Sequence, residues 1–128
     1  MGWGLTPRRS RLCSSLVERH RLDGVTVLVI DDHLDSLELA ELVLQRAGAR
    51  VLAAPGAEAG LRFLDRERID VLVCDLAMPY LDGYELLRTL RARNDEKRAT
   101  PAIALSGNAA VGDVRRALQA GFDVHAAK

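Results

Sequence analysis

The chain has 128 residues, of which 48% are hydrophobic and 4% aromatic, and this composition predicts one folded domain with an aliphatic core. Its 18 basic residues balance 18 acidic ones, which gives no indication of binding to nucleic acid or to a membrane surface. No apolar run approaches the roughly 18 residues that span a bilayer, and no apolar segment follows the N-terminal arginines as in a signal peptide. The cytoplasm is therefore the expected location.

Residues 1–24 differ in composition from the rest, and we interpret them as an N-terminal extension or linker. They contain a proline and the basic run 8–11, and residues 12–19 have only weak helical amphipathicity. Asp23-Gly24 is a turn signal, so the folded domain is predicted to cover residues 25–128. Cys13 and Cys74 do not have the spacing of a metal site or a redox motif. Cys74 lies in a predicted strand, which favours a buried, reduced thiol.

The first apolar run, residues 25–30, is a predicted strand that ends at two aspartates, Asp31 and Asp32. A helix is predicted from about residue 35 to 47, with Asp35 and Glu38 as a capping pair. A short strand at 51–54 and a helix at 57–66 follow. Gly60 lies inside that second helix and costs about 1 kcal/mol relative to alanine, which predicts a weak element.

The run at 71–74 leads into Asp75 and then into the loop Leu76-Ala77-Met78-Pro79, a pattern typical of a strand buried on both faces. Asp82 and Glu85 are predicted to cap the third helix. A polar connection at 94–100, a strand at 102–105, a helix at 110–120 and a strand at 122–127 complete the chain before Lys128. Strands that alternate with helices predict an α/β fold with a doubly wound parallel sheet.

The polar residues that follow the predicted strands should meet at one edge of that sheet, because parallel strands end on the same side. They are Asp31 and Asp32, Asp75, Ser106, and Lys128. An aspartate after a strand can merely cap a loop, but three clustered carboxylates repel one another unless a cation neutralises them. Oxygen ligands with access to water suit Mg²⁺. A carboxylate nucleophile with a cation, a hydroxyl and an ammonium beside it provides the groups needed for phosphoryl transfer.

Residues 25–128 resemble a response-regulator receiver domain. The resemblance rests on several segments in order: Val29-Ile30-Asp31-Asp32, Asp75-Leu76-Ala77-Met78-Pro79 with Asp82-Gly83, Ala104-Leu105-Ser106-Gly107, Ala120-Gly121-Phe122, and Lys128. Residues 22–25 also look like the start of receivers attached to hybrid sensor kinases.

The resemblance implies a flavodoxin-like, five-stranded sheet in the order 2-1-3-4-5. It also implies that Asp75 accepts a phosphoryl group from a histidine kinase or a phosphotransfer protein and thereby switches protein contacts. Asp31, Asp32, Asp75 and the backbone carbonyl of Ala77 would hold Mg²⁺, while Ser106 and Lys128 would contact the phosphoryl oxygens. Such a domain is not an ordinary enzyme, although it assists its own phosphoryl transfer and slow dephosphorylation. The output domain or protein is left open.

Two departures from the family pattern stand out. His125 takes the position of a switching aromatic residue, and the chain ends at Lys128, where family members continue into a last helix. Without that helix, apolar side chains such as Val27, Val29 and Val124 are expected to lack cover on one face. The alternative reading is a pseudo-receiver or fragment that acts only through protein contacts. A phosphatase would carry a second acid at Ala77, and a flavin protein would not carry acids after the first strand.

Overall fold

The computed structural model describes residues 21–76, 83–107 and 111–127. The elements in this part of the chain, in order, are β1 (Thr26–Ile30), α2 (Leu34–Arg46), β2 (Arg50–Ala54), α3 (Ala57–Arg66), β3 (Val71–Asp75), α4 (Gly83–Arg91), the 3₁₀ helix η1 (Glu96–Ala99), β4 (Ala102–Ser106), α5 (Val111–Ala120) and β5 (Val124–Ala127). The expected alternation of strands and helices is confirmed. No helix follows β5 within residues 21–127, and none in the described ranges is long and apolar enough to cross a membrane.

The five strands form one parallel sheet in the order β2-β1-β3-β4-β5, as the sequence predicted. β1 lies between β2 and β3, and its Ile30 pairs with Ala54 on one side and Cys74 on the other. This register aligns the carboxyl ends of β1 and β3. Any side chains that follow those two strands are therefore brought to the same edge of the sheet.

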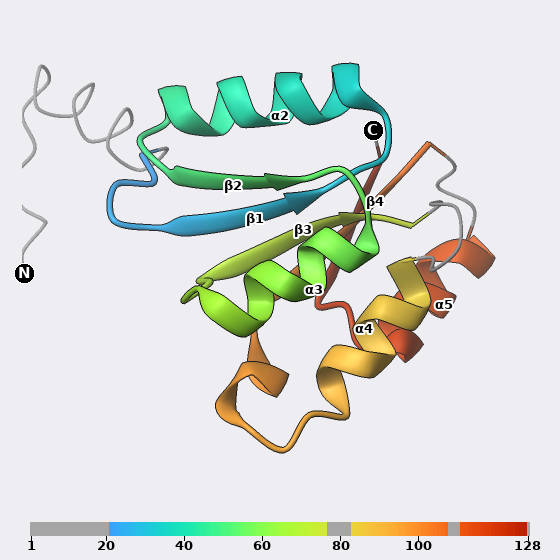
Figure 1. Ribbon diagram of the computed structural model, residues 1–128. Coiled ribbons are helices and arrows are strands. Elements are labelled where there is room, and N and C mark those ends of the chain that lie inside the picture. Colours follow the sequence, from blue (N-terminus) through green and yellow to red (C-terminus); the bar gives the residue numbers. More distant parts are fainter. Residues whose placement is uncertain (1–20, 77–82, 108–110, 128) are drawn as a thin grey trace, which may run out of the picture.

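Helices cover both faces of the sheet, with α2 on one face and α3, α4 and α5 on the other (Figure 1). Successive residues of β1 point to opposite faces, which explains its continuous apolar sequence. Leu28 and Ile30 belong to the larger apolar cluster under α3 and α4, whereas Val27 and Val29 belong to the cluster under α2. Cys74 is fully buried in the larger cluster, which confirms the expected packed thiol.

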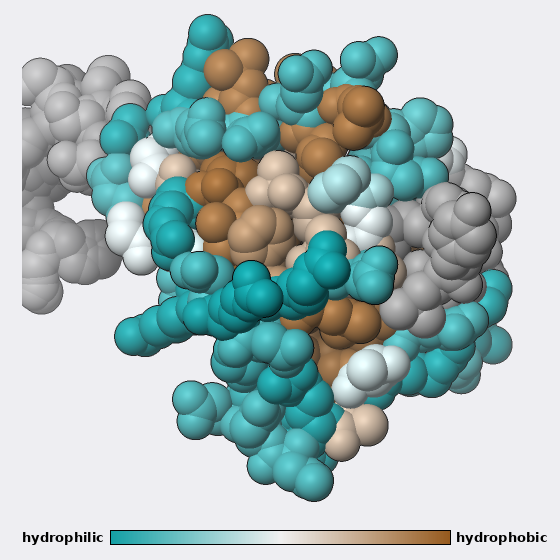
Figure 2. Space-filling model, viewed as in Figure 1, coloured by the Kyte–Doolittle hydropathy of each residue, from teal (hydrophilic) through white to brown (hydrophobic). Residues whose placement is uncertain are grey.

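The cover of the α2 face is uneven across the sheet. Val27 and Val29 are only 1% exposed, so the expectation that they lack cover is wrong, because α2 packs directly over β1 and β2. Val124 on β5 is 52% exposed, as expected. Between α2 and the strands β3 and β4 lies a mainly apolar groove of about 420 Å³, lined in part by Leu39, Val43, Val73, Ile103 and Leu105. Figure 2 shows hydrophobic residues, in brown, exposed among hydrophilic ones, in teal, around α2.

At the opposite end of the sheet from the strand ends that carry the aspartates, Arg91 of α4 joins three segments. Its guanidinium donates to the carbonyl oxygens of Arg98 and Thr100 at 2.7 Å each and of Gly121 at 2.9 Å. It also lies 3.2 Å from a carboxylate oxygen of Asp123. This one side chain therefore connects η1, the start of β4 and the start of β5.

Local details correct the sequence-based boundaries. The helix α2 begins at Leu34 with His33 at its N-cap and no side-chain capping bond, so the capping role expected of Asp35 and Glu38 is wrong. The connection at 94–100 contains η1, whose N-cap Asp95 accepts a hydrogen bond from the main-chain nitrogen of Lys97. A Cβ at Gly60 would lie 2.2 Å from Ile30 Cδ1, so this glycine permits close packing of α3 on β1. The last strand is shorter than expected and begins at Val124.

Candidate functional site

The ends of β1 and β3 bring two buried carboxylates together. Asp75 is the last residue of β3 and Asp31 directly follows β1, and each residue is only 3% exposed. The main-chain nitrogen of Asp31 donates to the carbonyl oxygen of Ala54 at 3.1 Å, which holds the end of β1 against β2. The aspartates are therefore placed by the sheet itself and not by an adaptable surface loop.

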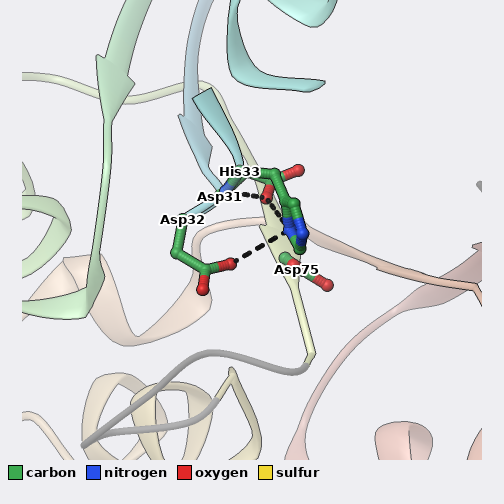
Figure 3. Close-up of side chains that lie close together, drawn as sticks. All are labelled: Asp31, Asp32, His33 and Asp75. Carbon is green, nitrogen blue, oxygen red and sulfur yellow. Dashed lines mark hydrogen bonds and ion pairs between the residues drawn. The ribbon is translucent and has the colours of Figure 1, made fainter. Parts of the chain in front are cut away.

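Asp32 and His33 complete a compact cluster with Asp31 and Asp75. One ligand atom from each of the four residues lies within 4.8 Å of the others. The imidazole Nδ1 of His33 lies 3.5 Å from Asp32 Oδ1 and 3.9 Å from Asp31 Oδ1. Figure 3 shows the imidazole ring and the three carboxylates gathered where β1 and β3 end. The cluster thus offers both oxygen and nitrogen ligands around one small space.

The donor set fits a divalent cation. Asp32 Oδ1 is buried and has no hydrogen-bond partner among the described residues, and a buried carboxylate oxygen left in this way is unfavourable. Three carboxylates so close together also repel one another. A bound cation would relieve both costs, and carboxylates with access to water are typical Mg²⁺ ligands. The expected gathering of Asp31, Asp32 and Asp75 is thus present in the structure.

Gly83, the first residue of α4, lies against the backbone at the end of β3. Its main-chain nitrogen donates to the carbonyl oxygen of Leu76 at 3.1 Å. A Cβ on Gly83 would stand 2.5 Å from the carbonyl oxygen of Asp75, closer than real contacts allow. The Asp82-Gly83 pair was noted in the sequence, and Gly83 serves here to let α4 approach the candidate site. The capping role expected of Asp82 lies outside the described residues.

Ser106 ends β4 beside this cluster, because β4 pairs with β3 and Asp75 lies opposite Leu105. Its hydroxyl forms a 3.1 Å hydrogen bond with Nε2 of His125 on the neighbouring strand. Both side chains are half-buried. His125, which takes the position of a switching aromatic residue in the family, is therefore in contact with a predicted site residue.

Two predicted site residues, Ala77 and Lys128, lie outside the described residues. His33, in contrast, belongs to the cluster although the sequence analysis did not select it. The available signal was its position directly after Asp31-Asp32, at a strand end where three oxygen ligands were already expected.

Comparisons with known proteins agree with this architecture. The family model for the response regulator receiver domain matches residues 27–128. The chain is 42% identical over 108 residues to an uncharacterised 14.6 kDa protein of Leptolyngbya boryana, covering 84% of this chain and 81% of that protein. It is 32% identical over 126 residues to the sensor histidine kinase GacS of Pseudomonas protegens, covering 97% of this chain and 14% of the kinase.

A similar solved structure is the receiver domain of the sensor histidine kinase PA1611 from Pseudomonas aeruginosa, which has a magnesium ion coordinated in its active site cleft. The TM-score is 0.74 at 34% identity, with 82% of this chain and 85% of that chain covered. The present chain spans only 8% to 16% of the length of several larger signalling relatives that it matches.

Proposed function

Because the chain belongs to the response regulator receiver domain family, we propose that Asp75 is its phosphoacceptor in a two-component phosphorelay. The observation that carries the proposal is the position of Asp75, buried at the end of the central strand β3 and within a cluster of ligand groups. The runner-up, a pseudo-receiver that is never phosphorylated, is disfavoured because Asp31, Asp32, Asp75, Ser106 and Lys128 are all present.

In the proposed reaction, a carboxylate oxygen of Asp75 forms a bond with the phosphorus of a phosphohistidine. The phosphorus–nitrogen bond breaks, and the donor imidazole keeps its electron pair. Bound Mg²⁺ supplies charge neutralisation for the phosphoryl oxygens. Asp31 and Asp32, with Asp75 and the backbone carbonyl of Ala77, would hold that ion.

Ser106 and Lys128 would contact the phosphoryl oxygens once they are on Asp75. Ser106 is supported by the pairing of β4 with β3, and Lys128 by its place directly after β5 in the sequence. A hydroxyl and an ammonium donate hydrogen bonds to the anionic oxygens. The Ser106 hydroxyl would then exchange its bond with His125 for one with the phosphoryl group. This exchange is a route from phosphorylation to a change on β5.

The phosphoryl donor would be a histidine kinase or a phosphotransfer protein, and the domain would act as a switch that assists its own phosphorylation and slow dephosphorylation. The support is the similarity to domains within sensor histidine kinases. We further propose that residues 25–128 form the receiver and that residues 1–24 are an extension or linker.

The test is intact-mass analysis after incubation with MgCl₂ and acetyl phosphate, a small phosphoryl donor. Wild type should gain one phosphoryl group, and Asp75→Asn should gain none. Asp35→Asn is the matched control, because Asp35 is an exposed acid in the first turn of α2 and lies outside the cluster. A phosphoryl group retained by Asp75→Asn would refute the assignment, and an unlabelled wild-type protein would favour the pseudo-receiver.

A further inference from the structure

His33 adds to the acidic cluster a ligand type that a magnesium site does not require. Its Nδ1 lies 3.5 Å from Asp32 Oδ1 and 3.9 Å from Asp31 Oδ1, and a ring nitrogen of His33 lies within 4.8 Å of ligand atoms of Asp31, Asp32 and Asp75. Two metal ligands at about 2.1 Å from an ion can be up to about 4.2 Å apart. Both distances are therefore short enough for one ion to bind Nδ1 together with either carboxylate.

The backbone at the start of α2 places the imidazole ring at the cluster. The main-chain nitrogen of His33 donates to Asp31 Oδ1 at 2.9 Å, and the residue has the extended conformation of an N-cap, with φ −86° and ψ 111°. This bond ties the His33 backbone to a carboxylate of the cluster, and Figure 3 shows the ring lying beside Asp31 and Asp75. The side chain is otherwise 74% exposed, so an ion can reach Nδ1 without a rearrangement of the core.

Asp32 Oδ1 gives a second, independent indication of a ligand at the same place. It is buried without a hydrogen-bond partner in the described part of the chain, although Nδ1 of His33 lies 3.5 Å away. The ring and this carboxylate oxygen therefore approach one another without a hydrogen bond between them. An ion between the two atoms would be bound by both.

Imidazole changes which ion such a site prefers. Mg²⁺ favours oxygen ligands and keeps several waters, whereas imidazole nitrogen is a good ligand for first-row transition ions. We propose that His33 Nδ1 is a further metal ligand and that the cluster binds Mn²⁺ more tightly than Mg²⁺ for this reason. The inference rests on the metal site of the proposed function and extends it to the choice of ion.

The test compares Mn²⁺ and Mg²⁺ binding to the full 128-residue chain and to His33→Asn, by calorimetry and by pulsed electron paramagnetic resonance of bound Mn²⁺. Coordinated imidazole gives a nitrogen modulation in the resonance signal. We expect this modulation in wild type and in the control His20→Asn, and its loss in His33→Asn. We also expect the affinity for Mn²⁺ to fall at least about tenfold in His33→Asn, because even the loss of a residue that only hydrogen-bonds to a metal ligand has an effect of this size. The affinity for Mg²⁺ should change less than about twofold, because Mg²⁺ prefers oxygen ligands.

The outcomes separate this inference from the proposed function. Mn²⁺ that binds wild type without nitrogen modulation, or a Mn²⁺ to Mg²⁺ affinity ratio unchanged in His33→Asn, would overturn the role of His33 and leave the phosphoacceptor assignment intact. If neither ion binds wild type, both the inference and the metal site of the proposed function are wrong.

Discussion

Asp32→Asn should make the metal-free domain more stable while it removes the response to Mg²⁺. The carboxylates of Asp31, Asp32 and Asp75 have oxygens within 4.8 Å of one another. At that separation, Coulomb's law with an effective dielectric constant of about 20 gives roughly 3.5 kcal/mol of repulsion for each pair of unit charges. The side chain of Asp32 is 27% exposed, and solvent screening lowers this value. We therefore expect a gain of about 1–2 kcal/mol in the free energy of unfolding.

The assay is thermal unfolding at a mildly alkaline pH, where histidine is ordinarily neutral, with and without MgCl₂. A gain of this size raises the midpoint by roughly 3–12 °C for a domain of this length. The control Asp35→Asn should shift the midpoint slightly downward, because an acid in the first turn of a helix is stabilising. A metal-free midpoint of Asp32→Asn at or below that of wild type would contradict the argument, as would a full Mg²⁺ response in this variant.

Three further substitutions test packing near the site and in the core. Gly60→Ala gains about 1 kcal/mol of helix propensity but places its Cβ 2.2 Å from Ile30 Cδ1, so urea unfolding should show a net loss of roughly 1–2 kcal/mol. Gly83→Ala puts a methyl group 2.5 Å from the Asp75 carbonyl oxygen, and it should lower both stability and the rate of labelling by acetyl phosphate. Leu87→Ala, at a fully buried position, should cost about 2–5 kcal/mol without changing the metal response. An unchanged unfolding midpoint in any of the three would contradict the packing described for it.

The sheet and its strand ends were predictable because the pattern that encodes them is local and strong. Apolar runs at 27–30 and 71–74 lead directly into aspartates, and strands buried on both faces require such runs. Parallel pairing then places Asp31 and Asp75 at one edge whatever the details of the helices between them. The order of the strands came from the family resemblance, since periodicity alone does not distinguish one parallel order from another.

The helix entry after β1 was not predictable from the capping pattern. Asp35 and Glu38 have the right spacing, but the side chain of Asp31 already accepts the main-chain hydrogen of His33 and turns the chain into α2 earlier. A contact between the residue that ends a strand and the start of the next helix depends on tertiary geometry. For the same reason, the sequence did not single out His33, because its place in the cluster depends on where its ring lies.

The exposure of apolar side chains on one face of the sheet was predicted correctly for β5 and wrongly for β1. From the last helix of other family members, we expected Val27, Val29 and Val124 to lack cover, and this was wrong for Val27 and Val29 because α2 lies over β1 and protects both. Which strands a single helix covers depends on where it crosses the sheet. The apolar groove lies instead between α2 and the strands β3 and β4.

Because of this unequal cover, local unfolding should be rare in the strands β1 and β3 and frequent in β5. Amide hydrogens of β1 and β3, which lie between other strands, should exchange with deuterated solvent last, and those of the edge strand β5 first. The carboxylates that would hold the metal lie at the ends of β1 and β3, whereas the Ser106–His125 pair bridges to the strand that opens most readily. Phosphorylation of Asp75, as proposed above, would then act on local unfolding of β5 without disturbing the carboxylates that would hold the metal.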